Sequence, residues 1–299
     1  MSPSPRVGVL LLAHGAPTRL EDLPRYAASL FGGRSVSAEV LEDMRERYRR
    51  IGASPLVPVT LAQGRALARR LNRSAGGSDF EVVVGMRHSE PTLESALAAL
   101  SGGAVSRAVV VPMTPYSACR APYVEEVSRL GGASFAHRLL ELRVDESGLA
   151  AVFASRVRAA LARLPEGPRR EARVLFCAHS LPVFTAGYAE EFSRAASAVA
   201  RAAGASSWSL AYQSRGRHGN DWLGPGVDDA LRKLAADGER AVVLAPIGFL
   251  AENLETLYDC DLLHAETARS LGLAFSRAKA PDADPDLVET LAGLVEALA

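Results

Sequence analysis

Short apolar runs of strand length alternate along this chain with longer stretches of helical period. The runs are continuous and rich in Val, Ile and Leu, which is typical of strands buried on both faces of a parallel sheet. The strands are predicted at Val7–Ala13, Glu81–Gly85, Arg107–Val111, within Ser134–Val144, and at Val174–Ala178, Trp208–Gln213, Ala241–Ile247 and Leu273–Arg277. The stretches between them predict amphipathic helices, among them Glu39–Ile51, Leu61–Leu71, Phe184–Ala203, Val227–Asp237 and Asp286–Leu298.

Two pairs of segments show that this plan occurs twice. LLLAHGAP (Leu10–Pro17) matches LFCAHSLP (Leu175–Pro182), and AVVVPM (Ala108–Met113) matches AVVLAPI (Ala241–Ile247). Alternating strands and helices with continuous apolar strands predict parallel sheets covered by helices. The duplication therefore predicts an α/β protein of two similar Rossmann-like domains.

A chain of 299 residues is long for one domain and sufficient for two. We expect an N-terminal domain over residues 1–150 and a C-terminal domain over 151–299, and the final helix could pack back on the first domain. In doubly wound sheets, ligands bind beyond the carboxyl ends of the strands. His14, His88 and His179 each follow a predicted strand, so we expect them on a binding edge.

The most unusual stretch follows the strand that ends at Ile247. It is helical in period and carries Glu252, Glu255, Asp259 and Asp261. Glu255 and Asp259 are four residues apart and share a helix face, where like charges repel. A solvated acidic face and a site that attracts a cation or accepts protons both explain this pattern. Together with His179, Glu255 could take protons from a substrate and hold a divalent metal transiently.

Composition excludes several classes of function. Lys+Arg and Asp+Glu both number 34, so the basic excess of a nucleic-acid-binding protein is absent. No apolar run reaches the ~20 residues of a membrane span. The three cysteines lie far apart without a CxxC motif, which favours a reduced cytoplasmic protein without an iron–sulfur cluster or a permanent zinc site. GxSxG and the glycine-rich phosphate motifs are absent from the sequence.

Taken together, the motifs resemble those of the ferrochelatase family. The resemblance rests on FCAHSLP (Phe176–Pro182), YQSRG followed by DWLGP (Tyr212–Pro225), ENLETLYDCD (Glu252–Asp261), and LLLAHGAP with IGASPL (Ile51–Leu56). It implies the class II chelatase fold, with a porphyrin cleft between two Rossmann-like domains. It also implies a lyase that inserts Fe²⁺ into protoporphyrin IX or coproporphyrin III, forming haem or coprohaem.

By the same resemblance, His179 and Glu255 match the catalytic pair of the family and would handle metal delivery and removal of the pyrrole protons. The implied metal ligands are His179, Glu255 and Asp259, with His14 and Asp261 as weaker candidates. The expected porphyrin-binding residues are His14, Phe31, Arg34, Ser54, His88, Met113, Tyr116, Tyr123 and Trp222. Several positions depart from the family pattern. Leu263 stands where Glu is common, and Asn253 where His is common. The branch that uses coproporphyrin often has Tyr where this chain has His14, and it carries a pair of arginines of which only Arg34 remains nearby.

The implied partners are a porphyrin and Fe²⁺ as substrates, without a permanently bound cofactor. A neighbouring enzyme of the haem pathway is a further candidate partner, and peripheral membrane contact stays open. Three alternatives remain at this stage. One is a cobalt or iron chelatase for sirohydrochlorin, whose members usually carry two nearby histidines for the metal. The others are a non-catalytic porphyrin or haem carrier, and a sugar- or ion-binding two-domain protein.

Overall fold

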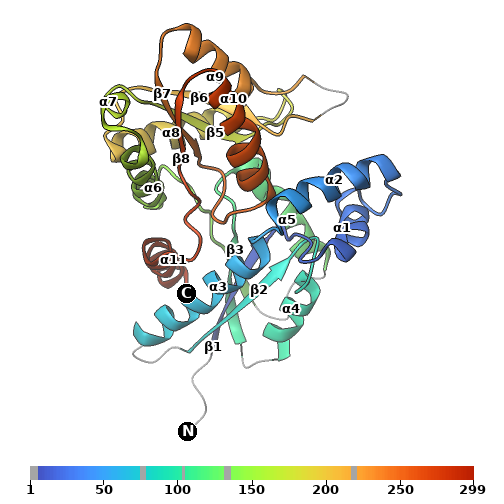
Figure 1. Cartoon of the computed structure of the whole chain (residues 1–299). Coiled ribbons are helices and arrows are strands. Elements are labelled where there is room, and N and C mark those ends of the chain that lie inside the picture. Colours follow the sequence, from blue (N-terminus) through green and yellow to red (C-terminus); the bar gives the residue numbers. More distant parts are fainter. Residues whose placement is uncertain (1–5, 75–78, 103–104, 131–135, 217–220) are drawn as a thin grey trace. The chain divides into compact units, whose positions relative to one another are not determined.

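A computed structural model describes residues 6–74, 79–102, 105–130, 136–216 and 221–299. The chain divides into two compact units. The first comprises Met1–Pro115, Cys119–Leu142 and Asp282–Ala299, and the second comprises Tyr116–Ala118 and Arg143–Pro281. Each unit contains one four-stranded sheet in which all strand pairs are parallel (Figure 1).

The sheet of the first unit has the strand order β2-β1-β3-β4. Its strands are β1 (Arg6–Ala13), β2 (Phe80–Met86), β3 (Val105–Pro112) and β4 (Ala136–Leu139). These are the strands that the apolar runs predicted, although residues 134 and 135 of the expected fourth strand lie outside the described residues. β1 is central because its apolar side chains are buried on both faces of the sheet.

Helices cover both faces of this first sheet. Leu10 and Leu12 pack with Leu97 of α4 on one face, while Leu11 points to the other face, as the period of two requires. There α3 approaches the sheet closely, since a Cβ on Gly64 would lie 2.8 Å from Val84 Cγ2. The helical segments of the unit are η1 (Leu20–Asp22), α1 (Leu23–Leu30), α2 (Ala38–Ile51), α3 (Leu56–Ser74), α4 (Leu93–Gly102), α5 (Ser117–Arg129, from Cys119 on) and α11 (Pro285–Leu298).

The C-terminal helix α11 belongs to the first unit although it ends the chain. Arg70 of α3 contacts Glu289 and Glu296 of α11, and Gln63 Nε2 donates to the backbone oxygen of Asp282 at 2.9 Å. The first unit therefore combines segments from both ends of the sequence.

The sheet of the second unit repeats the first, with the order β6-β5-β7-β8. Its strands are β5 (Arg173–His179), β6 (Trp208–Gln213), β7 (Ala241–Pro246) and β8 (Ala274–Arg277). β1 and β5, and likewise β3 and β7, occupy equivalent places in the two sheets. The predicted duplication and the α/β fold class are thus confirmed.

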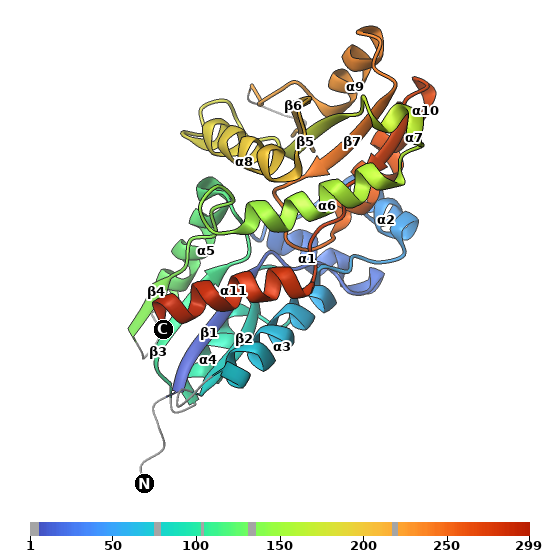
Figure 2. The same cartoon turned by 90° about the vertical axis from the view of Figure 1, so that its left-hand side faces the viewer.

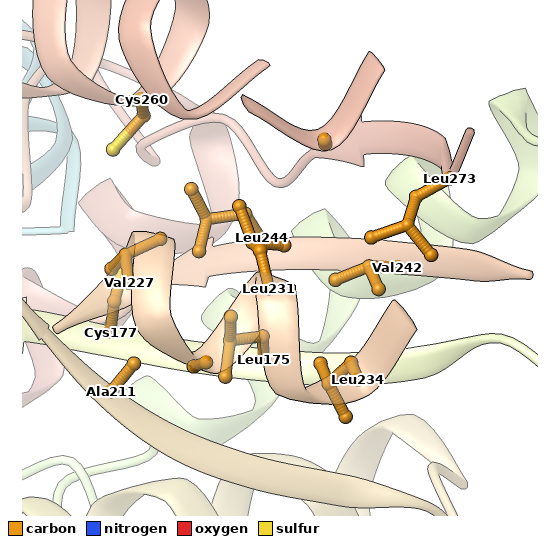
Figure 3. Packing of buried hydrophobic residues seen from close by; sticks show 12 residues of the cluster. Leu175, Cys177, Ala211, Val227, Leu231, Leu234, Val242, Leu244, Cys260 and Leu273 are labelled. Carbon is orange, nitrogen blue, oxygen red and sulfur yellow. The ribbon is translucent and has the colours of Figure 1, made fainter. Parts of the chain in front are cut away.

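The helices of the second unit also cover both faces of its sheet. Figure 3 shows Leu231 and Leu234 of α9 packed over Leu175 of β5 and Val242 of β7, and all four are buried. Phe176 points to the opposite face because neighbouring strand residues alternate. On that face α6 and α8 pack against each other (Figure 2). The helical segments are α6 (Leu149–Arg163), α7 (Glu166–Arg169), α8 (Tyr188–Ala203), α9 (Val227–Ala236), the π-helix η2 (Glu255–His264) and α10 (Ala265–Ser270).

Among the helices in the described ranges, none combines the length and the apolar character needed to cross a bilayer.

Candidate active site

Three neighbouring strand ends of the second sheet converge on one group of polar side chains. β5 lies between β6 and β7, and the chain reverses its winding direction between β5 and β7, which is where doubly wound sheets bind ligands. His179 ends β5, and its register partner Gln213 ends β6. Glu255 begins the π-helix that follows β7. The strand order thus brings together residues that are up to 76 positions apart.

His179 and Glu255 form a direct pair, with Nδ1 of the imidazole 3.0 Å from Oε2 of the carboxylate. The backbone of His179 is fixed as well, because Tyr188 Oη donates to its carbonyl oxygen at 2.7 Å. The next residue, Ser180, is fully buried and donates its hydroxyl to the Leu223 carbonyl at 2.8 Å. One hydrogen bond at the His179 backbone and another at the Ser180 side chain therefore hold the start of the loop after β5.

Two further polar groups lie within hydrogen-bond distance of the same oxygen of Glu255. Gln213 Nε2 donates to Oε2 at 3.1 Å and Ser214 Oγ lies 2.8 Å from it. Ser214 Oγ also lies 2.7 Å from Asp259 Oδ2. A hydroxyl has one hydrogen, so Ser214 can donate to only one of the two carboxylates at a time. The other short contact places two electron-rich oxygens together, an arrangement that a proton or a cation would relieve.

The surroundings of the pair shift the pKa values of Glu255 and His179 in opposite directions. Burial by itself raises the pKa of Glu255, but the charge of His179 and the hydrogen bonds from His179, Ser214 and Gln213 outweigh it and lower this pKa to about 2. Burial lowers the pKa of His179, while the charge and hydrogen bond of Glu255 and the charge of Asp259 outweigh it, so the net shift is upward. The pair therefore favours a carboxylate beside an imidazole that readily holds a proton.

Asn253 starts the helix that carries Glu255. Its Oδ1 accepts hydrogen bonds from the backbone N–H groups of Glu255 and Thr256 at 2.8 and 3.3 Å, and its own N–H donates to Thr256 Oγ1 at 2.9 Å. This reciprocal arrangement is that of an N-terminal cap. π-helical segments are rare and frequently lie at functional sites. The Asn that departs from the family pattern thus has a local role in placing Glu255.

The remaining carboxylates of this stretch face a different partner. Arg277 is buried and donates to both oxygens of Asp261 at 2.6 Å, and its Nη1 donates to Glu252 at 2.8 and 3.0 Å. The structure therefore brings Asp259 to the His179–Glu255 pair but turns Asp261, the weaker metal candidate, toward an arginine. Arg277 was not predicted, since a lone Arg at the end of a strand has no distinctive sequence signal.

Two of the predicted histidines meet in the first unit. The ring centroids of His14 and His88 are 4.6 Å apart, and Tyr26 lies edge-on to both at 6.3 and 6.4 Å. Nδ1 of His88 is 2.9 Å from Ser29 Oγ. Burial and the charge of Arg87 lower the pKa of His88, which favours the neutral imidazole that can bind a metal. The juxtaposition arises because β1 and β2 are neighbours.

The other first-unit candidates differ in accessibility. Phe31 is 40% exposed, and its carbonyl accepts a hydrogen bond from Arg34 Nε at 3.1 Å. Met113 and Tyr123 are half-buried against the apolar clusters of the unit. Ser54 is almost fully buried and its hydroxyl accepts from the backbone N–H of Leu56 at 3.4 Å. Phe31 and Arg34 therefore offer the most surface to a ligand.

Tyr116 and Trp222 lie in the second unit. Tyr116 is buried in the core, where its ring packs edge-on against Tyr188 at 5.2 Å and its hydroxyl donates to the Ile247 carbonyl at 3.3 Å. Trp222 is half-buried and pairs through its backbone with Pro182. A ligand-binding role for either, and a porphyrin site shared by both units, stay predictions.

Sequence reasoning missed Gln213 and Ser214 as members of the site, although both lie in the YQSRG motif. It also missed two thiols behind Gln213, those of Cys177 and Cys260. Hydrogen bonding with Cys177 and burial raise the pKa of Cys260, so its thiol keeps its hydrogen. Among the described residues there is no group of three or more His, Cys, Asp or Glu side chains arranged to hold a metal ion permanently.

Comparisons with known proteins identify the family to which the chain belongs. The family model described as Ferrochelatase matches residues 6–298. The chain is 32% identical over 302 residues to the coproporphyrin III ferrochelatase of Bacillus subtilis (strain 168), with 97% of each chain covered. It is 34% identical over 301 residues to the enzyme of the same name from Anoxybacillus flavithermus (strain DSM 21510 / WK1), with 97% of this chain and 95% of that protein covered.

Other similar proteins carry related names. The Ferrochelatase of Deinococcus radiodurans is 34% identical over 304 residues, covering 97% of this chain and 95% of that protein. Among solved structures, SirB from Bacillus subtilis with Fe³⁺ superposes with a TM-score of 0.58 at 13% identity, covering 97% of this chain and 94% of that one. CbiX, described as the terminal enzyme for biosynthesis of sirohaem in denitrifying bacteria, superposes with a TM-score of 0.57 at 14% identity. The superposition covers 98% of this chain and 99% of that one.

The two solved structures show a shared chelatase fold, while the family model and the sequence relatives show the family. The chain belongs to the ferrochelatase family, whose members are enzymes that insert a metal ion into a porphyrin.

Proposed function

We propose that this chain inserts Fe²⁺ into coproporphyrin III, with His179 as the proton acceptor and Glu255 as the anion that stabilises the imidazolium and attracts the metal. The observation that carries the chemical assignment is the 3.0 Å contact between His179 Nδ1 and Glu255 Oε2. The choice of coproporphyrin III is supported by the names of relatives that match this chain over almost its whole length.

The reaction requires two protons to leave the pyrrole nitrogens while one dication enters. Glu255, with a pKa of about 2, stays ionised at neutral pH and is a poor proton acceptor there. The pKa of His179 is raised by the charge and hydrogen bond of Glu255, so its imidazole is the more basic of the two groups and the better proton acceptor. With Nδ1 directed to Glu255, Nε2 is the nitrogen that would accept the two protons one at a time, passing the first to solvent before it takes the second. This division of roles follows from the charges around each group.

Ser214 and Asp259 extend the negative charge beyond the pair. Two carboxylates that share one hydroxyl hydrogen form an oxygen-rich group. Such a group would attract Fe²⁺ and release it without the full ligand set of a permanent site. Asp261 would contribute less, because Arg277 already neutralises its carboxylate.

The proposal is tested by offering the purified protein three tetrapyrroles in parallel under anaerobic conditions with Fe²⁺. The rate of insertion is measured as the loss of porphyrin fluorescence. We expect metal insertion into coproporphyrin III to be faster than into protoporphyrin IX. Faster turnover of protoporphyrin IX would contradict the assignment of substrate. Tight binding of both porphyrins without insertion would instead identify a carrier.

A second candidate is the insertion of iron or cobalt into sirohydrochlorin, which is the third tetrapyrrole in this assay. The close contact of His14 and His88 favours it, because two neighbouring imidazoles can bind such metals. Efficient turnover of sirohydrochlorin that is lost in His14→Ala and His88→Ala, but kept in Glu255→Gln, would select this candidate.

A further inference from the structure

Behind Glu255, the side chain of Gln213 is held between a carboxylate and two thiols. Its Nε2 donates to Glu255 Oε2 at 3.1 Å. At the other end of the amide, Oε1 lies 3.1 Å from Cys177 Sγ and 3.3 Å from Cys260 Sγ. Cys177 is on β5 and Cys260 is on the π-helix, and both are fully buried. Gln213 is only 2% exposed. The amide thus links both elements to the catalytic carboxylate.

The two thiols and the carboxylate favour the same orientation of the amide. A thiol donates a weak hydrogen bond, and an amide oxygen has two lone pairs that can accept both S–H groups. If the amide were reversed, Oε1 would face the Glu255 carboxylate and its NH₂ group would face the sulfurs. The reversed form would lose the donor to Glu255 and set two acceptors against each other. The thiols therefore favour the orientation that supports Glu255.

Packing alone does not require sulfur at these two places. The surrounding cluster is apolar, with Leu175, Val227 and Leu244 among its members (Figure 3). An alanine would keep the apolar character of either position. What an apolar side chain cannot supply is a hydrogen for the buried amide oxygen.

We propose that Cys177 and Cys260 are positioning residues that orient the Gln213 amide and, through it, the Glu255 carboxylate. The proposal rests on the role proposed above for Glu255. Both thiols are fully buried, so their effect would pass through one hydrogen-bonded side chain. Loss of both donors should therefore lower the rate of insertion without weakening porphyrin binding.

The test compares a double variant that removes the donors with one that keeps them. For Cys177→Ala/Cys260→Ala we expect kcat to fall about 10-fold, as for other residues that orient a reactive carboxylate through hydrogen bonds, with the porphyrin KM unchanged. Cys177→Ser/Cys260→Ser keeps O–H donors and should restore most of kcat. Cys119→Ala, which removes the third cysteine from the first unit, is the matched control and should behave as wild type.

A second readout follows the amide itself and needs no activity. The side-chain NH₂ signal of Gln213 in a ¹⁵N–¹H correlation spectrum is assigned by its loss in Gln213→Met. It should move in the double alanine variant and stay in place in the double serine variant. An unmoved signal together with wild-type kcat in the alanine variant would overturn the proposal.

If the double alanine variant does not fold, Cys177→Ala and Cys260→Ala are measured singly by the same two readouts. If the wild-type enzyme fails to insert metal, the proposed function fails, while the amide signal still decides whether the thiols orient Gln213.

Discussion

Replacing Glu255 by Gln should change how the stability of the second unit depends on pH. In the folded protein the pKa of Glu255 is about 2, against an ordinary value of 4.5. A glutamate whose pKa is lowered by folding stabilises the protein above its unfolded pKa, and the stabilisation is lost as the pH falls through the folded pKa. Glu255→Gln has no such group and cannot show this loss.

The size of the effect follows from the two pKa values. Their difference corresponds to about 3 kcal/mol of unfolding free energy at neutral pH. Between about pH 5 and about pH 3, wild type should lose roughly 2 kcal/mol of it, because the unfolded glutamate takes up a proton in this range and the folded one does not. This window lies below the ordinary histidine pKa of about 6.5, so the titration of His179 contributes little.

The assay is urea unfolding followed by tryptophan fluorescence. The chain has two tryptophans, Trp208 and Trp222, and both lie in the second unit, so the signal reports that unit. The gap in unfolding free energy between wild type and Glu255→Gln should narrow by roughly 2 kcal/mol on acidification. Glu266→Gln is the control, since it removes a carboxylate that is 79% exposed and in an ion pair of the kind that contributes about 0–1 kcal/mol.

A gap between wild type and Glu255→Gln that stays constant over this range would refute the reasoning. It would mean that the imidazole and the two hydrogen-bond donors do not hold the carboxylate in its ionised form.

Three further substitutions test the parts of the site that support the pair. Ser214→Ala removes a donor to Glu255 and should raise the KM for Fe²⁺ by roughly 10-fold, measured by initial rates at varied metal concentration; an unchanged KM for Fe²⁺ would argue against the oxygen-rich group. Arg277→Met leaves Glu252 and Asp261 without their buried partner and should cost about 3–5 kcal/mol of unfolding free energy in the urea assay, so a cost below ~1 kcal/mol would contradict the burial of this network. Asn253→Ala removes the helix cap and should cost about 0.5–2 kcal/mol in the same assay, with Asn253→Asp close to wild type.

The sheets and their duplication could be predicted because buried parallel strands have an unmistakable apolar pattern. The repeated Ala-His motif marked β1 and β5 as equivalent, and their central places in the two sheets confirm it. The meeting of His179 and Glu255 followed from the placement of strand ends, strengthened by the family resemblance. These inferences rest on backbone topology, which the pattern of apolar residues largely determines.

The finer arrangement could not be predicted, since it depends on side-chain direction. Asp261 has the same charge as Asp259, but only the structure shows that Arg277 binds it. A helical period does not distinguish a π-helix from an α-helix, so the contact between Glu255 and Ser214 could not be predicted. The ring of Tyr116 packs edge-on against Tyr188, a contact that no local sequence pattern predicts. Each case turns on a contact between residues distant in the sequence.

The central claim is that His179 and Glu255 act as a pair in metal insertion, and one anaerobic assay tests it most directly. Fe²⁺ and coproporphyrin III are given to wild type, His179→Ala, Glu255→Gln and His137→Ala, whose histidine is exposed on β4. We predict that His179→Ala and Glu255→Gln each lower kcat by about 100-fold or more, while His137→Ala matches wild type. Near-wild-type turnover in both pair variants would contradict the account.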